Sequence, residues 1–347
     1  MKNLIIATIA LVGISIALAG SGADTAGSIE RLDPGLDAIV PAGAKLEKLG
    51  TCCKWTEGPV WIHAGYVLFA DIPGNRIMKW TPAGGILVFM HPTGFLGQEA
   101  YGGPESGSNG MTLDRRGRLT IAGHAQRDVY RLESLAKGAK ITLLAEKYQG
   151  KRLSSPNDLV YRSDGSLYFT DPPYGLPTQG DKDPLKELPF NGVYRIPKVL
   201  THPPGTPPDD ARLELLIKDL TRPNGIAFSP DERYLYIAVS DPDHKVWMRY
   251  DVQKDGSVTN GKVFYDATSD KADGLPDGMK LDQKGNIYSA APGGVYIISP
   301  EGKHLGTIKM PEKTANLNWG GGDARTLYIT ASTSLYRIRL EIPGDRP

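Results

Sequence analysis

Six related segments follow one another along this 347-residue chain, and each has the same order of elements. A polar residue opens each segment and is followed by an apolar strand, a polar turn, a second apolar strand, a loop and a third strand. The segments begin at Glu57, Asn109, Asn157, Asn224, Asp277 and Asn316. A repeat of about fifty residues that holds several strands predicts a β-propeller, with one sheet per blade around a central channel.

The predicted fold is therefore an all-β, six-bladed β-propeller with a central metal site. A β-sandwich is the main competing all-β architecture, but it gives no reason for one order of elements to recur six times. The sixth segment supplies only three strands before the chain ends at Pro347. We expect an N-terminal strand at residues 44–49 to complete that blade and close the ring, because an open ring would leave exposed sheet edges.

The domain organisation predicted from these patterns has three parts: a signal peptide at 1–19, an N-terminal extension at 20–43 and a single propeller domain at 44–342. Residues 1–19 (MKNLIIATIALVGISIALA) place one lysine before an apolar run that ends in an A-x-A cleavage site. An uncleaved N-terminal anchor is the alternative. No later apolar stretch is long enough to span a bilayer. The mature protein is predicted to be periplasmic or secreted, with no membrane contact after cleavage.

Charge and cysteine content exclude some partners. The chain has 40 Lys and Arg against 39 Asp and Glu, so no net field favours binding to nucleic acid or to an anionic membrane.

The two cysteines, Cys52 and Cys53, are adjacent. Side chains of neighbouring residues point apart along an extended chain, so we expect two buried thiols, with a vicinal disulfide as the alternative in an oxidising compartment.

The six opening residues should ring one end of the channel, which we call the top. Loops between blades and between second and third strands return to the same face, so inserts at 94–108 and 176–191 should flank the channel mouth. A second ring is expected from the ends of the second strands: Asp71, His124, Asp171, Ser240, Ala291 and Ser332. The inner ring contains only carboxylates and carboxamides, which suit a hard cation such as Ca²⁺.

The repeats resemble the SMP-30/gluconolactonase/luciferin-regenerating-enzyme family of six-bladed propeller hydrolases, and most of all its bacterial gluconolactonases. The similarity covers roughly residues 49–338. The segments that carry it are TEGPVW, FADIPGNRIMKW, SNGMTLDRRGRL, YQGKRLSSPNDLVYRSDGSLYFTDPPYG, RPNGIAFSPDERYLYIA, PDGMKLDQKGN and TLYITASTSLYRI. Two departures are the long Gly-rich insert before Asn109 and Ala122-Gly123-His124, where many relatives have Cys-Glu-His.

The resemblance implies a divalent metal in the channel, with Ca²⁺ as the expected ion and Zn²⁺ or Mg²⁺ as alternatives. The implied metal ligands are Glu57, Asn157, Asn224 and Asp277. Asn109 is implied to face the substrate, and His124, Asp171 and Tyr174 are further candidates for substrate binding from the top face. Asp277 is the candidate to position or deprotonate the attacking water, and His124 is the rival base.

The resulting hypothesis is the opening of a sugar lactone such as D-glucono-1,5-lactone, with the cation polarising the ring carbonyl. The chain has no G-x-S-x-G elbow, so a serine nucleophile is not indicated. An arylesterase or phosphotriesterase is one alternative. A non-catalytic, exported propeller that binds sugar or calcium is another.

Overall fold

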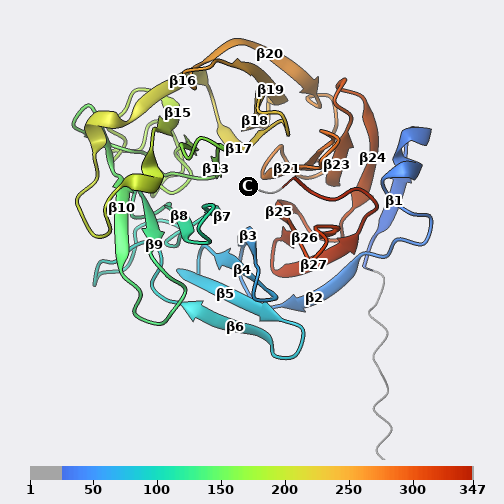
Figure 1. Cartoon of the computed structure of the whole chain (residues 1–347), viewed down its shortest axis with the longest axis horizontal. Coiled ribbons are helices and arrows are strands. Elements are labelled where there is room, and N and C mark those ends of the chain that lie inside the picture. The colour runs from blue at the N-terminus through green and yellow to red at the C-terminus, as the bar shows by residue number, and fades with distance from the viewer. Residues whose placement is uncertain (1–25, 346–347) are drawn as a thin grey trace, which may run out of the picture.

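The computed structural model describes residues 26–345 and shows six antiparallel sheets arranged radially around one axis (Figure 1). Blades one and two comprise β3 (Thr56–Ile62), β4 (Tyr66–Asp71), β5 (Arg76–Thr81), β6 (Gly85–Met90), β7 (Met111–Leu113), β8 (Leu119–Gly123), β9 (Asp128–Leu132) and β10 (Ile141–Ala145). Blades three and four comprise β13 (Leu159–Tyr161), β14 (Leu167–Asp171), β15 (Asn191–Ile196), β16 (Glu214–Leu220), β17 (Pro223–Phe228), β18 (Tyr234–Asp241), β19 (His244–Val252) and β20 (Val258–Asp266). The all-β, six-bladed propeller predicted from the repeats is confirmed.

The last two blades combine strands from both ends of the chain. Blade five contains β21 (Met279–Leu281), β22 (Ile287–Ala291), β23 (Gly294–Ile298), β24 (His304–Lys309) and the N-terminal β1 (Ser28–Arg31). Blade six contains β25 (Thr314–Gly320), β26 (Thr326–Ala331), β27 (Ser334–Arg339) and the N-terminal β2 (Glu47–Thr51). A short ribbon of β11 (Lys147–Tyr148) and β12 (Lys151–Arg152) lies outside these sheets.

Burial within each blade follows from its position between two others. The second strands β8, β14 and β22 are buried at every residue, because a neighbouring blade covers each of their faces. Aromatic rings fill the spaces between blades, as where Tyr168 of β14 meets Phe228 of β17 edge-on at a centroid distance of 4.9 Å. The outermost β20 is largely exposed.

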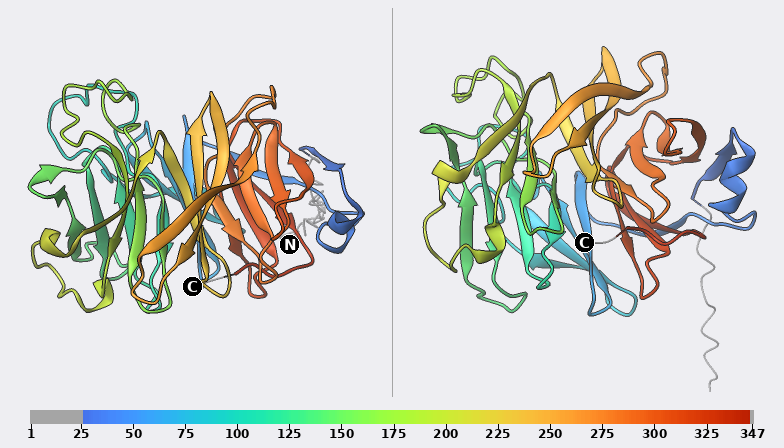
Figure 2. Two further views of the ribbon diagram at one scale, coloured as in Figure 1. Left: turned by 90° about the horizontal axis from the view of Figure 1, so that it is seen from above. Right: turned by 45° about the horizontal axis from the view of Figure 1, so that its top comes forward.

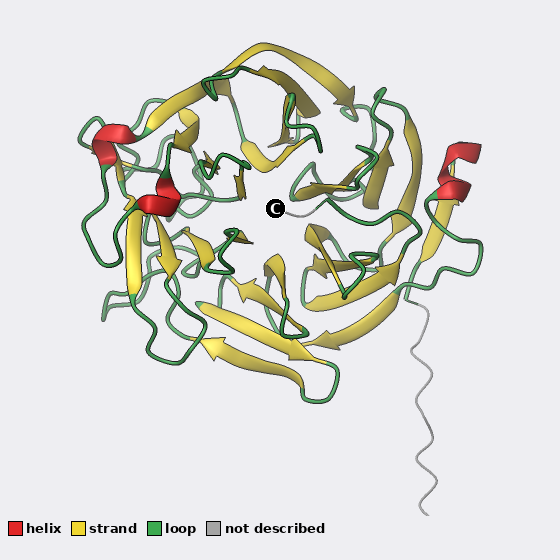
Figure 3. Cartoon of the chain, viewed as in Figure 1, coloured by secondary structure: helices red, strands yellow, loops and turns green. Residues whose placement is uncertain are grey.

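The N-terminal segment is more closely integrated than the predicted division into a 20–43 extension and a 44–342 domain suggests. β1 pairs with β24, and η1 (Pro34–Ala38) buries Leu36 against blades five and six. β2 pairs with β27, where Arg337 donates to Glu47 at 2.7 Å. Figure 3 places all of the short helical turns at the periphery of the ring. The predicted signal peptide lies outside the described residues.

The expectation of two buried thiols is wrong, because Cys52 and Cys53 form a disulfide. The expectation assumed an extended strand, but both residues lie in the non-strand segment between β2 and β3. There the two backbone N–H groups donate to one acceptor, the carbonyl of Thr333, at 3.1 and 3.4 Å. Both cysteines are only partly buried.

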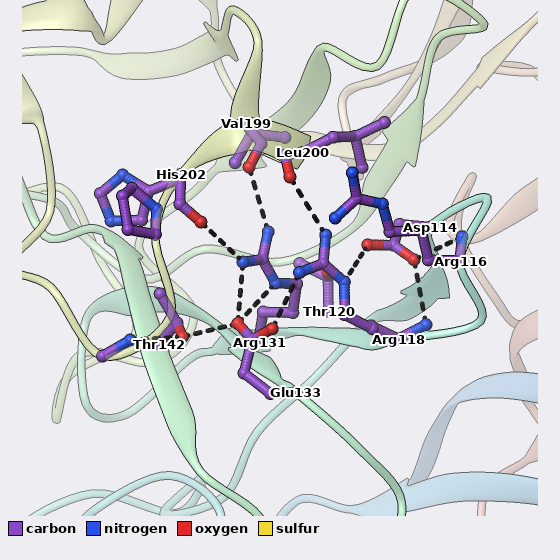
Figure 4. A network of polar contacts seen from close by, with 12 residues as sticks. Asp114, Arg116, Arg118, Thr120, Arg131, Glu133, Thr142, Val199, Leu200 and His202 are labelled. Atoms are coloured by element: carbon purple, nitrogen blue, oxygen red, sulfur yellow. Dashed lines mark hydrogen bonds and ion pairs between the residues drawn. The ribbon is translucent and has the colours of Figure 1, made fainter.

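Loops divide between two faces of the disc. Figure 2 shows the long inserts between β6 and β7 and between β14 and β15 on one face, and the loop that carries η2 (Val199–Thr201) and η3 (Asp210–Arg212) on the other. A buried network fixes this second loop to blade two (Figure 4). Arg131 donates to the carbonyls of Val199 and His202 and to the carboxylate of Glu133, which also accepts from Arg118.

Among residues 26–345, no helix combines the length and apolar character that crossing a membrane would require.

Candidate functional site

A cavity of about 580 Å³ opens at the top of the channel and brings most of the predicted site residues together. Its lining includes Glu57, Asn109, Asn157, Asn224 and Asp277, which come from five different blades. A volume of this size suits a single small-molecule ligand.

A glycine follows four of the opening residues, and it allows the inner strands to converge. A Cβ placed on Gly58 would lie 2.5 Å from the carbonyl oxygen of Asn109, and one on Gly225 would lie 2.2 Å from that of Asp277. Both distances are too short for any side chain, so glycine is required at these positions. The recurring polar-residue–Gly pair is therefore the sequence signature of closely packed inner strands.

Four carbonyl or carboxylate oxygens in this cavity have no hydrogen-bond partner among the described residues. They are Oδ1 of Asn109, Asn157, Asn224 and Asp277. The amide of Asn224 is oriented by its other end, since Nδ2 donates to Ser240 Oγ at 2.9 Å. A buried acceptor without a partner costs free energy, so these four oxygens are available to a cation, a polar ligand or water in the cavity.

Two buried carboxyl groups complete the inner ring. Desolvation raises the pKa of Glu57 to about 8, and the nearby carboxylates of Asp158 and Glu105 add to the rise. Desolvation likewise raises the pKa of Asp277 well above its ordinary value, followed by repulsion from Glu57. Both shifts describe a site in which negative charge lacks compensation, and a bound cation would supply it.

The donor set fits a hard cation. Two carboxylates and several amide oxygens are the ligands that Ca²⁺ takes in proteins, whereas Zn²⁺ prefers histidine and cysteine. Consistently, the part of the chain from 26 to 345 contains no group of three His, Cys, Asp or Glu side chains arranged to hold a metal. Any metal in this cavity would therefore depend on the asparagine oxygens.

The remaining predicted residues separate into two groups. Asn109 and Tyr174 line the cavity, and the Tyr174 hydroxyl donates to the carbonyl of Ser240 at 3.0 Å. Asp171 does not join them. Its carboxylate is fully buried and accepts from the backbone N–H groups of Ser154 and Ser155 at 2.8 and 2.7 Å. Asp171 thus holds the segment that leads to Asn157, and it faces the backbone instead of the cavity.

His124 lies behind the cavity wall. It contacts Glu105, a cavity residue that the sequence analysis did not identify. The imidazole is fully buried, and its Nε2 is 2.8 Å from Oε2 of Glu105. Glu105 lines the cavity from the insert between β6 and β7. The signal available in the sequence was a single carboxylate within the Gly-rich run GGPESGS that precedes Asn109.

A family model described as "SMP-30/Gluconolactonase/LRE-like region" matches residues 55–333, which include blades one to four, strands β21–β24 of blade five and strands β25 and β26 of blade six. The chain belongs to this family. The resemblance predicted from the repeats is thereby confirmed.

Members and relatives of the SMP-30/gluconolactonase family match most of the chain. A gluconolactonase from Zymomonas mobilis is 36% identical over 92% of this chain and 88% of its own length. A regucalcin from Xenopus laevis is 34% identical over 80% of this chain and 83% of its own. The solved structure of a gluconolactonase from Xanthomonas campestris superimposes with a TM-score of 0.74 at 31% identity, covering 90% of this chain and 94% of that one.

The two segments that the resemblance marks as departures from the family pattern meet in space. The Gly-rich insert supplies Glu105, and the Ala122-Gly123-His124 segment supplies the imidazole that contacts it. Both lie at the channel mouth, next to the ring residues that follow the family pattern.

Proposed function

We propose that this protein is a metal-dependent lactonase that opens a sugar lactone, with D-glucono-1,5-lactone as the first substrate to test. The lactonase class rests on membership of the family and on the gluconolactonase relatives. The observation that carries the proposal is the cluster of partnerless oxygens in one cavity, three from asparagines and one from Asp277, beside the buried carboxyl group of Glu57.

In this proposal Glu57, Asn157, Asn224 and Asp277 hold the cation, with Ca²⁺ preferred by the oxygen donor set. A bound cation supplies positive charge that polarises the lactone carbonyl and stabilises the developing oxyanion. Asp277 Oδ1 lines the cavity without a protein partner and can accept a proton from the attacking water. Asn109 binds a substrate oxygen or hydroxyl through its free amide, and the ring of Tyr174 forms one wall.

An assay of acid release from D-glucono-1,5-lactone tests this function directly. Spontaneous opening is measured without enzyme, and the enzyme is compared after chelation and after Ca²⁺ is restored. We expect fast opening that is lost on chelation and regained with Ca²⁺. Turnover of aryl esters alone would indicate an arylesterase, and no turnover of either substrate by the metal-loaded protein would indicate a binding protein.

We also propose that the protein functions outside the cytoplasm. The pattern of residues 1–19 supports export, and the disulfide between Cys52 and Cys53 suits an oxidising compartment. Cell fractionation of the full-length chain, with N-terminal sequencing of the mature form, tests this. An intact N-terminus in the cytoplasmic fraction would contradict it.

A further inference from the structure

Glu105 lines the same cavity as the predicted metal ligands, and His124 lies behind it, outside the cavity lining. Nδ1 of His124 is 3.1 Å from the carbonyl oxygen of Pro156, and Nε2 is 2.8 Å from Oε2 of Glu105. A carbonyl oxygen can only accept, so Nδ1 carries a hydrogen. The imidazole is thus fixed in one orientation by the main chain.

This arrangement requires a second proton between the two side chains. A lone pair on Nε2 and an ionised carboxylate would both be acceptors, and two acceptors do not hydrogen-bond at 2.8 Å. The bond therefore holds one proton, located on Nε2 as an imidazolium or on Oε2 as a carboxylic acid. In either form the pair carries a transferable proton and no net charge.

Packing keeps the imidazole in place and leaves the carboxyl group accessible. A Cβ added to Gly175 would lie 2.7 Å from Cδ2 of His124, so the chain passes directly over the ring. The Tyr101 hydroxyl donates to the carbonyl of Gly175 and ties the two inserts together there. The side chain of Glu105 is 21% exposed, against 0% for His124, and it lines the same cavity as Asp277.

Lactone opening needs a proton at a second place besides the attacking water. When the ring C–O bond breaks, its electron pair remains on the ring oxygen, which would leave as an alkoxide. An alkoxide is a poor leaving group, and a positioned acid that protonates it contributes about 10²–10⁴-fold to the rate. Two carboxyl groups in different surroundings are a common way to divide acid and base roles.

We propose that Glu105 is the proton donor to the leaving ring oxygen and that His124 is the positioning residue behind it. This assignment rests on the proposed lactonase function. Water adds to the carbonyl carbon and gives a proton to Asp277. The C–O bond then breaks, and the ring oxygen takes the proton held by the Glu105–His124 pair and becomes the product hydroxyl. The proton on Asp277 passes through water to restore the pair, so the net reaction consumes one water.

Two lactones with different leaving groups distinguish a proton donor from a residue with a purely structural role, because only loss of a proton donor would slow one lactone much more than the other. Glu105→Gln is compared with the parent on δ-valerolactone, which releases an alkoxide, and on dihydrocoumarin, which releases a phenolate that needs no acid. We expect a fall in kcat of about 100-fold or more on the first lactone and less than about 3-fold on the second. Glu99→Gln is the matched control, since Glu99 is an exposed carboxylate on the same insert and outside this cavity.

A second readout does not depend on turnover. Imidazole ¹⁵N NMR of the substrate-free protein should show His124 protonated at Nδ1, with a further proton shared with Glu105 that Glu105→Gln removes. Equal losses on both lactones, no loss on either, or a neutral ring protonated only at Nε2 would each overturn the assignment. A parent enzyme that opens neither lactone nor D-glucono-1,5-lactone would instead refute the proposed function, and the catalytic role of Glu105 would fall with it.

Discussion

The buried carboxyl groups of the inner ring make a quantitative prediction about stability with and without metal. The pKa of Glu57 is raised to about 8 in the metal-free protein, mainly by desolvation, against an ordinary value near 4.5. The folded metal-free state therefore binds a proton more tightly than the unfolded state does. The contribution of Glu57 to stability is therefore fully present below pH 4.5 and is lost as the pH rises towards 8.

The contribution of Glu57 alone follows from one proton, and Asp277, whose pKa is also raised, adds to it in the same direction. Between pH 5 and pH 7 the folded state holds one more proton at Glu57 than the unfolded state, which changes the stability by about 1.4 kcal/mol for each pH unit, or about 3 kcal/mol in total. A cation that keeps Glu57 ionised removes this dependence. For a domain of this size the difference corresponds to about 4 °C in Tm.

Differential scanning fluorimetry at several pH values, on chelated protein and on protein with saturating Ca²⁺, measures the effect. We expect the gain in Tm from Ca²⁺ to be larger at pH 7 than at pH 5, and we expect Glu57→Gln to weaken the pH dependence of the metal-free protein. Glu99→Gln should leave it unchanged. A gain in Tm that is the same at both pH values, or no gain at all, would refute the reasoning.

Four further predictions concern single positions or segments. Asp277→Asn should lower kcat for lactone opening by about 100-fold or more, because the proton acceptor is lost, while circular dichroism shows the parental fold. Burial raises the pKa of Asp128 to about 7, so the contribution of this group to stability is lost as the pH rises from 3.8 through 7. Urea titration should therefore show that Asp128→Asn is more stable than the parent by about 2 kcal/mol at pH 8 and no more stable at pH 4. Glu133→Gln should destabilise the protein by about 3 kcal/mol in the same assay, because it leaves the buried Arg131 without its ion pair. A loss under about 1 kcal/mol would mean that the carbonyls of the 197–213 loop are enough to stabilise the Arg131 guanidinium. Deleting residues 44–51 removes β2 and exposes the edge of β27, so the melting transition should be lost or greatly lowered, and a parental transition would contradict this.

Much of the site could be predicted because the repeat constrains it. Each opening residue stands at the start of an inner strand, and six such strands around one axis must place these residues at one end of the channel. Glu57, Asn109, Asn157, Asn224 and Asp277 meet there as expected. The inserts at 94–108 and 176–191 also lie on the expected face, since antiparallel connectivity within a blade fixes where each loop emerges.

Other features depend on contacts that no local pattern encodes. Asp171 occupies the strand end predicted for it, but its direction is decided by two backbone N–H groups of residues that precede Asn157. The disulfide lies in the segment after β2, where the backbone of both cysteines is hydrogen-bonded to the carbonyl of Thr333, about 280 residues away. Pairing of β1 with β24 likewise joins opposite ends of the chain.

The sequence by itself determined the blade count, the order of the first three strands in each blade and the oxygen-rich inner ring, because these follow from a period that recurs six times. Only the tertiary structure decided how Glu105 is used. An insert has no period, so the direction in which it folds back is set by what it can pack against. Here it packs so that a lone carboxylate meets the buried imidazole of His124 at the edge of the cavity.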